Sequence, residues 1–517
     1  MIANAKTLVP LVWGLLSLRA AAGVVNPLVL RNDDDFATSR ACTRLSSRFP
    51  HSVSWPNSIE FQTQSTALYS DTCIFTPSCV FEPSSAAMIA EGVKIMKAER
   101  SKFAVRSGGH MPVPGAQSVQ GGVMIAMDKL NQKSLNAAKT VASIGPGQVW
   151  ADVYNWLVPY GLAVNGGRYP SVGVGGYMLG GGISYFSSTK GWGCDTVVAY
   201  EVVLADGQVV EARANGAYSD LFWALHGGHN NFGIVTRFDL QTFPMTSAYV
   251  GGAIWDGRDA SANTQYFAAL NSYLAPGGGA EDPNVAISAI LALTPSEGVK
   301  ELISIQLAPG TQEQPRAFEN FTKIMAPAIQ TVPGMVAPSW TSILPLLQQF
   351  GDRGFRQLFW SISFKGDPRA IRIANETLVD LADAALSGIP NATVAFTYQP
   401  VSKAWLQASK ASGNNVLDLD PKDGAFVAGL LACTWQDKAD DAAIHAFARN
   451  FSSAVENKTR ALELFHPFAY LNDAAPEQKP FETYGQGKSL PRLRRIRDKY
   501  DPDNFLKNFM GHGFLLD

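Results

Sequence analysis

The 517-residue sequence predicts a protein of mixed helices and sheets, α/β or α+β, with two or three domains. Three observations predict this. The chain is too long for one ordinary core, since a domain has about 150 residues. Patterns typical of strand, turn and helix alternate over its first half. Hydrophobic residues make up 46% and charged residues 17%, which provides a sizeable core and is unlike a disordered chain.

The first residues have the order of a secretory signal. Lys6 precedes an apolar run at 8–18, and the small residues 20–23 follow it. The run is shorter than the roughly 20 residues that span a membrane. We therefore expect a signal peptide over 1–23 and a secreted, extracellular chain without a membrane anchor.

Glycosylation triplets and cysteines agree with export. Five Asn-x-Ser/Thr triplets are candidate acceptors in surface loops: Asn320, Asn375, Asn391, Asn450 and Asn457. In an oxidising compartment one disulfide could form among three early cysteines, with its pairing left open: Cys42, Cys73 and Cys79. No Cys/His group has the spacing of zinc ligands, so we expect no metal.

Elements with clear periodicity follow one another up to residue 157. A helix is expected over 84–99, because Ile89, Val93 and Met96 share one face and serines precede it. A short strand at 103–105 then leads into a tight turn at 107–110. A buried strand at 123–127 and a helix at 149–157 come next.

The segment 161–193 is unusually rich in glycine, with aromatic and aliphatic residues in between. Flexible linkers are rich in glycine and serine and lack aromatic residues, so a backbone that passes close to a ligand is favoured over a linker. A nicotinamide-binding loop is disfavoured because Met178 stands where the third glycine of G-x-G-x-x-G belongs. No P-loop is present either.

Turn signals continue to residue 248, where the character of the sequence changes. Asp206-Gly207 predicts a hairpin, 220–224 a short helix, and 233–238 a strand. The net charge is −2, unlike that of a nucleic-acid binder. A basic run near the end fits the solvated face of a helix and includes Arg492, Arg494, Arg495, Arg497 and Lys499.

His110 follows a strand and two glycines, so its ring can project from a turn toward a ligand. A histidine can be a nucleophile, a base, a metal ligand or a structural turn residue, and the local pattern leaves these open.

Several motifs follow one another in order: Arg106-Ser107-Gly108-Gly109-His110, then 166–168 with 172–176, then 179–184, 220–228 and 230–236. Together they resemble the motifs of berberine-bridge-enzyme-like oxidases, which belong to the vanillyl-alcohol-oxidase and PCMH type of FAD-linked flavoprotein. Near the end, 484–485 and 499–505 resemble the closing segment of the family. The similarity covers about 70–247 and 465–517, and fungal secreted members are the nearest in character.

This resemblance implies FAD bound covalently through His110. The other residues that it implies in cofactor binding are Arg106, Ser107, Gly108, Gly109, Ser171, Val172, Gly175, Gly176, Gly181, Gly233, Ile234, Val235 and Asn472. Many relatives carry a cysteine two residues after the Gly-Gly pair, which forms a second bond to the flavin. Tyr169 stands there in this chain, and a phenol does not replace that thioether, so a single covalent bond is expected.

The catalytic base is left open by the sequence. Tyr470-Leu471-Asn472-Asp473 resembles the Tyr-x-Asn-Tyr stretch of the family, with Asp473 in place of the second tyrosine. The candidates are Tyr470, Asp473, Tyr169 and Tyr185. A phenol would need a pKa well below its usual value of about 10, which a cation such as Arg168 could provide.

The resemblance implies an α+β fold in which two α/β subdomains form a PCMH-type FAD-binding domain at 70–247. A substrate domain at 248–464 would have an antiparallel sheet covered by helices, and 465–517 would pack back on the FAD domain. We expect a monomeric oxidase that removes a hydride from an alcohol, a sugar or a secondary metabolite, with dioxygen as acceptor. The alternatives are a flavoenzyme of secondary metabolism that couples oxidation to a cyclisation, and a secreted binding protein without activity.

Overall fold

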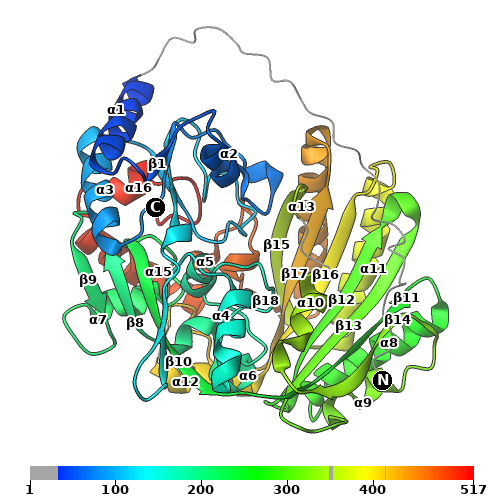
Figure 1. The fold of residues 1–517 in the computed structure, drawn as a ribbon. Helices are drawn as coiled ribbons and strands as arrows, with labels where there is room; N and C mark the ends of the chain where they lie inside the picture. Colours follow the sequence, from blue (N-terminus) through cyan, green and yellow to red (C-terminus); the bar gives the residue numbers. More distant parts are fainter. Residues whose placement is uncertain (1–32, 349–352, 414) are drawn as a thin grey trace, which may run out of the picture.

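A computed structural model describes residues 33–348, 353–413 and 415–517 of the chain; the expected signal peptide at 1–23 lies outside them (Figure 1). The first sheet has four strands in the order β1-β2-β4-β3, and all pairs except β1 with β2 are parallel. Its strands are β1 (Val53–Ser54), β2 (Cys79–Phe81), β3 (Phe103–Arg106) and β4 (Val123–Ala126). Helices α1 (Asp33–Arg48), α2 (Ile59–Thr66) and α3 (Ala86–Glu99) accompany it.

The second sheet is antiparallel and has six strands, ordered β5-β6-β10-β8-β9 with β7 also paired to β10. Its strands are β5 (Lys133–Leu135), β6 (Val141–Ile144), β7 (Leu162–Val164), β8 (Val197–Val203), β9 (Val209–Ala212) and β10 (Ile234–Pro244). The helices between them are α4 (Trp150–Leu157), α5 (Val174–Leu179), α6 (Ser187–Lys190) and α7 (Ser219–Leu225). We call the first two sheets with their helices the two-sheet unit.

The third sheet, here called the large sheet, has eight antiparallel strands in the order β14-β11-β13-β12-β16-β17-β15-β18. Its strands are β11 (Ala248–Asp256), β12 (Ala286–Thr294), β13 (Val299–Pro309), β14 (Ala328–Ala337), β15 (Arg356–Lys365), β16 (Thr393–Val401), β17 (Phe426–Trp435) and β18 (Phe465–His466). In the order of the chain, the short helix α9 (Glu319–Thr322) comes between β13 and β14, and the short helix α10 (Leu344–Gln348) comes between β14 and β15.

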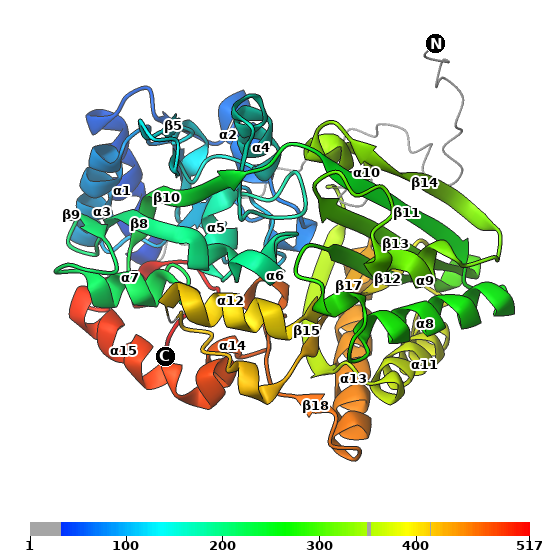
Figure 2. The same ribbon diagram turned by 90° about the horizontal axis from the view of Figure 1, so that it is seen from below.

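One face of the large sheet is covered by three long helices, as Figure 2 shows. They are α8 (Ala260–Leu274), α11 (Pro368–Leu386) and α13 (Asp441–Arg460). Tyr266, Ile371 and Phe447 of these helices join one buried cluster with residues of the sheet such as Leu291 and Phe396. These helices leave the opposite face of the large sheet uncovered, and that face is turned toward the two-sheet unit.

The last fifty residues return to the two-sheet unit. They form α14 (Pro480–Thr483), α15 (Ser489–Tyr500) and α16 (Phe505–Phe509). In Figure 2, α14 and α15 lie at the lower edge of the view with α12 (Lys403–Gly413). In Figure 1, α16 lies near α3, and its Phe505 shares a buried cluster with residues of that helix. The Gly511 amide donates to the carbonyl oxygen of Phe103 at 2.7 Å. The Leu516 amide donates to Oδ1 of Asn231 at 2.9 Å. The tail is thus hydrogen-bonded to β3 of the first sheet and to the segment that precedes β10 of the second.

The local elements expected from the sequence are present. The expected helix at 84–99 is α3, where the Ser85 hydroxyl accepts the Met88 amide at 3.3 Å. Asp206-Gly207 joins the antiparallel strands β8 and β9. The basic run lies on α15, but Arg497 is buried rather than solvated, because its guanidinium donates to the carbonyl oxygen of Leu516.

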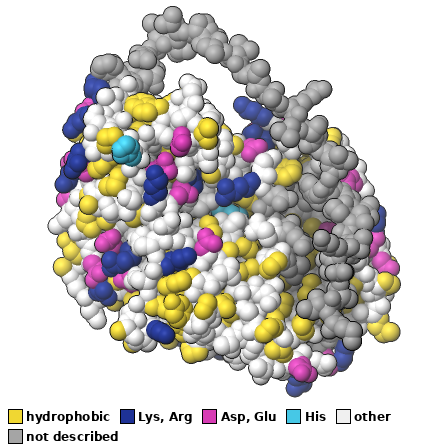
Figure 3. Space-filling model, in the orientation of Figure 1, with side chains coloured by type: hydrophobic (Ala, Val, Ile, Leu, Met, Phe, Trp, Pro, Cys, Tyr) yellow, Lys and Arg dark blue, Asp and Glu magenta, His cyan; other side chains and the backbone are white. Residues whose placement is uncertain are grey.

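The candidate glycosylation triplets are not all in loops. Asn391 lies in an exposed turn before β16, whereas the others lie within helices: Asn320 in α9, Asn375 in α11, and Asn450 and Asn457 in α13. On the face drawn in Figure 3, basic and acidic side chains are interspersed. Among the described residues, no helix is long and apolar enough to cross a membrane.

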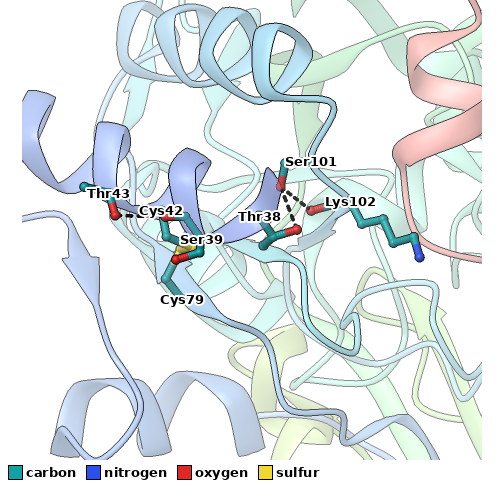
Figure 4. The surroundings of a disulfide bond; sticks show 7 residues. All are labelled: Thr38, Ser39, Cys42, Thr43, Cys79, Ser101 and Lys102. Atoms are coloured by element: carbon teal, nitrogen blue, oxygen red, sulfur yellow. Dashed lines mark hydrogen bonds between the residues drawn. A yellow bond between two sulfur atoms is a disulfide. The ribbon is translucent and has the colours of Figure 1, made fainter. Parts of the chain in front are cut away.

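A disulfide joins Cys42 of α1 to Cys79 of β2 (Figure 4). The sequence left this pairing open; Cys73, the third early cysteine, is a buried free thiol. The same region is held by the Ser101 hydroxyl, which donates to Thr38 and to the carbonyl oxygen of Lys102. Helix α1 is thereby fastened to the first sheet.

We predict that Cys42→Ser lowers the free energy of unfolding by about 2–4 kcal/mol, because the disulfide closes a loop of 37 residues. Denaturant unfolding measures this. A thiol reductant should lower the Tm of the wild-type protein and leave that of the variant unchanged. Equal sensitivity of the two proteins to the reductant would contradict the prediction.

Candidate active site

A cavity of about 1180 Å³ lies between the two-sheet unit and the free face of the large sheet. Pockets for a drug-sized ligand usually have about 300–1,000 Å³, so this one is large enough for more than a small substrate. Its wall includes His110 from the first half of the chain and Asp473 from the last fifty residues. The fold therefore gathers residues that lie far apart in the sequence.

The turn after β3 forms one end of the cavity. A side chain at Gly108 is excluded, because its Cβ would lie 2.4 Å from the backbone nitrogen of Gly173. Gly109 has φ +72°, and a Cβ there would lie 2.5 Å from the carbonyl oxygen of Ala67. Gly108 therefore lets the turn approach the start of α5, and Gly109 lets it approach the chain that follows α2. His110 comes next and lies at the cavity wall.

His110 stacks on Tyr69, with 4.0 Å between the ring centroids and 12° between the ring planes. Its Nε2 is buried and has no hydrogen-bond partner among the described residues. Burial, followed by the nearby Arg353 cation, lowers the pKa of His110 to about 4. The imidazole is therefore neutral near pH 7 and keeps a lone pair on a nitrogen that no protein group uses.

The start of α5 forms the neighbouring wall. The Ser107 hydroxyl donates to the carbonyl oxygen of Pro146 at 2.5 Å and accepts from the Gly175 amide at 3.2 Å. A Cβ added at Gly176 would meet no atom within 4 Å, and this residue lines the cavity. At Gly176, the backbone of α5 therefore borders the cavity with no side chain in between.

A polar chain crosses from this wall to the large sheet. Arg168 donates to Oε1 of Gln399, and Nε2 of Gln399 donates to Oδ2 of Asp473 at 2.8 Å. Burial raises the pKa of Asp473 to about 6, against the opposing effects of the Gln399 hydrogen bond and the Arg168 charge. The second carboxylate oxygen, Oδ1, accepts no hydrogen bond from the described part of the chain. One carboxylate oxygen of Asp473 is therefore hydrogen-bonded to Gln399, and the other can accept a hydrogen bond from a molecule in the cavity.

The three tyrosine candidates differ from Asp473. The Tyr470 hydroxyl accepts from the Gly182 amide at 2.9 Å and from Nδ2 of Asn472 at 2.8 Å. Burial raises the pKa of Tyr470 well above 10, and burial also raises the pKa values of Tyr169 and Tyr185. The Arg168 charge acts in the opposite direction on Tyr169 and Tyr185 and is outweighed. None of these phenols has the lowered pKa that a base near neutral pH needs.

Most residues expected at the site line the cavity. They are Ser107, Gly108, Gly109, His110, Tyr169, Val172, Gly175, Gly176, Ile234, Val235, Tyr470, Asn472 and Asp473. Others contact the protein instead: Arg106 pairs with Asp128, Gly181 lies against Tyr470, and Gly233 lies against Val202. Ser171 and Tyr185 do not border this cavity, and Tyr185 lies beside a smaller one behind it.

The sequence did not indicate three contributors. Tyr69 stacks on His110 and lies 5.8 Å from the Phe359 ring, and Gln399 holds Asp473. None of these residues belongs to a motif. Phe359 on β15 and Gln399 on β16 are placed by strand pairing in the large sheet, and Tyr69 lies in the chain that follows α2 in the two-sheet unit. Alternation along β15 and β16 does not tell which strand lies beside which, and Tyr69 stands in no periodic pattern.

The cavity fits FAD. Glycines without room for a side chain bring backbone to the wall, a bare stretch of α5 borders open space, and His110 presents an orphaned nitrogen. In the part of the chain that the structure describes, no group of three or more His, Cys, Asp or Glu residues could hold a metal ion.

Two family models match the chain. The FAD binding domain model matches residues 77–213, and the model for berberine and berberine-like proteins matches 469–510. The FAD-dependent monooxygenase prx3 of Penicillium roqueforti is 37% identical over 512 residues, with 97% of each chain covered. The bifunctional solanapyrone synthase of Alternaria solani is 29% identical, with 83% of this chain and 79% of that protein covered.

Solved structures agree on the fold. The carbohydrate oxidase of Microdochium nivale superposes with a TM-score of 0.72 at 22% identity, with 92% of this chain and 99% of that chain covered. At this identity the likeness concerns the arrangement of helices and sheets. It supports the α+β fold with a PCMH-type FAD-binding domain that the motifs predicted.

We predict that Gly176→Leu lowers the flavin content of the purified protein at least fivefold, because the new side chain projects into the cavity. The fold should persist, since a Cβ there meets no neighbouring atom. Visible absorbance per mole of protein measures flavin, and thermal unfolding of the flavin-free form measures the fold. Normal flavin content in Gly176→Leu would contradict the placement. Gly108→Ala, with its 2.4 Å clash, should instead fail to fold.

Proposed function

The chain belongs to the FAD-dependent oxidoreductases with a berberine-like C-terminal segment, and we propose that it removes a hydride from a C–H bond next to oxygen or nitrogen in a small organic molecule. One observation carries the proposal. The FAD-binding wall, the available Asp473 carboxylate and a wide substrate space converge on one cavity. We propose the division into an FAD part at 70–247, a substrate part at 248–464 and a closing segment at 465–517.

When bound, FAD would supply the acceptor for the hydride and the two electrons that it carries, which no amino-acid side chain can provide. The protein holds the substrate against that acceptor and excludes water. Residues of the large sheet form the wall of the cavity that faces the FAD wall, so a substrate between them is held on two sides. Such positioning lowers the entropic part of the barrier.

We propose that His110 forms the only covalent bond to the flavin. A neutral, unpartnered Nε2 supports this role, since a protonated imidazole could not act as a nucleophile. Tyr69 supports it as well, because its stacked ring fixes the imidazole plane. Tyr169 stands where a thiol would be needed for a second bond.

We propose Asp473 as the group that accepts the substrate proton. Gln399 fixes one carboxylate oxygen, and Arg168 behind Gln399 keeps a positive charge near the site. A carboxylate with a pKa of about 6 is ionised at neutral pH and still basic enough to take a proton from a hydroxyl in the transition state. Tyr470 then positions Asn472 rather than reacting itself, because its oxygen accepts two hydrogen bonds.

We further propose that dioxygen takes up the electrons and that the chain acts outside the cell as a monomer. The disulfide and the signal-like first residues support export. The name of prx3 favours a related second reaction, monooxygenation. The name of solanapyrone synthase includes the word bifunctional, which agrees with the alternative of an oxidation coupled to a second step. Peroxide release equal to substrate consumed distinguishes simple oxidation from oxygen insertion. A binding protein without activity is not proposed, because the chain belongs to an enzyme family.

We predict that His110→Ala releases all flavin into the supernatant after acid precipitation, whereas the wild-type precipitate stays yellow. Tyr169→Phe is the matched control and should keep its flavin in the precipitate. Colour retained in the His110→Ala pellet would rule out His110 as the attachment point.

We predict that Asp473→Asn slows anaerobic flavin bleaching by substrate about 10²–10⁴-fold, because the amide cannot accept the proton. In the wild-type protein the rate should fall as the pH drops below about 6, since a base must be ionised to act. Rapid mixing measures this step apart from reoxidation. Tyr185→Phe, outside the cavity, should bleach normally. A wild-type bleaching rate in Asp473→Asn would exclude Asp473 as the base.

A further inference from the structure

The wall that the large sheet gives to the cavity is built of rows that run across the strands. Side chains along a strand alternate between its faces, so every second residue points to the cavity and the rest pack under α8, α11 and α13. The strand pairing fixes which residues stand side by side. The side chains of each row therefore determine which substrates can bind against this wall.

The middle row consists of alanines. Ala292, Ala395 and Ala432 are direct partners on the adjacent strands β12, β16 and β17, and all three line the cavity. Their small side chains leave a trough across three strands. Glu301 on β13 is the partner of Ala292 at one end, and Phe359 on β15 is the partner of Ala432 at the other. Four strand spacings separate these ends, or about 19 Å.

The row on one side of the trough is mostly aliphatic. It consists of Ile303, Ile290, Thr397 and Leu430, which the pairing also aligns. The row on the other side has hydroxyls, but these are used within the protein. The hydroxyls of Thr294 and Thr393 lie 3.3 Å apart, and that of Thr434 donates to Gln357 at 2.6 Å. The trough therefore offers few free hydrogen-bonding groups along its length.

We expect a carbohydrate to bind weakly to this surface. Nearly every carbon of a sugar bears a hydroxyl, and burying one hydroxyl without a hydrogen bond costs about 1–3 kcal/mol. An apolar molecule gains instead, by about 25 cal/mol for each Å² of surface removed from water. The difference grows with the area of the substrate that lies on the alanines.

We propose that the substrate of this enzyme is an apolar compound, not a carbohydrate, and that it lies along the trough formed by Ala292, Ala395 and Ala432. The proposal rests on the proposed function, which supplies the reaction, and adds the substrate class. Phe359 links this trough to the FAD wall, because its ring neighbours Tyr69, which stacks on His110. Glu301 closes the far end.

Binding can be measured without turnover. We would titrate the flavin-loaded enzyme with 2-decalone, a two-ring ketone without hydroxyls, and separately with cellobiose, using isothermal calorimetry. We expect 2-decalone to bind at least tenfold more tightly than cellobiose, with the negative heat-capacity change typical of apolar burial.

Ala395→Phe should weaken 2-decalone binding at least tenfold, because its ring fills the trough. Ala214→Phe, an exposed alanine after β9, is the matched control and should bind like the wild type. Flavin content and Tm check that both variants fold. If Ala395→Phe does not fold, Ala432→Leu fills the same trough with a smaller side chain and should also weaken binding.

Two results would overturn the proposal: tighter binding of cellobiose than of 2-decalone, or unchanged 2-decalone binding in a folded trough variant. The proposed function fails separately. An enzyme that binds 2-decalone as expected but bleaches its flavin with no alcohol, amine or sugar would leave the apolar trough in place and remove the oxidation reaction.

Discussion

The architecture of the site depends on Tyr470, which is hydrogen-bonded to both halves of the molecule. Its backbone amide donates to the Ser361 hydroxyl on β15 at 2.9 Å, and its own hydroxyl accepts the Gly182 amide of the two-sheet unit at 2.9 Å. The residue is buried, so these bonds do not compete with water. These two hydrogen bonds hold the large sheet at a fixed distance from the glycine-rich segment of the two-sheet unit, and this distance determines the width of the cavity.

In the proposed function, the cofactor and the substrate lie against different walls of the cavity. Glycines and His110 of the two-sheet unit form one wall, and alternating residues of the large sheet form the other. A cavity-facing residue of the sheet can change without touching the helices behind it, because its neighbours along the strand point the other way. The fold can therefore keep one FAD wall while the opposite wall accepts different substrates.

The sequence predicted what depends on local pattern. The turn at Gly108-Gly109-His110, helix α3 and the Asp206-Gly207 hairpin all follow from neighbouring residues, and the motifs indicated FAD. It could not predict the partnership of Gln399 with Asp473, or the alignment of Ala292, Ala395 and Ala432, because these require the register of strands far apart in the chain. Arg497 shows the same limit. Its helix and the return of the last segment were predicted, but the hydrogen bond from its guanidinium to the Leu516 carbonyl oxygen was not.

The contacts of the tail also affect the order in which the protein folds. The first sheet is extended by a bridge between Phe103 and Met510, and Asn231 holds Phe514 and Leu516 through its side-chain amide. Met510 follows Phe103 by about 400 residues, so the tail reaches its place only after most of the chain has been synthesised. Contacts so distant in sequence slow folding, because a long stretch of chain must close before they form. The first sheet therefore gains its last strand contact late in folding.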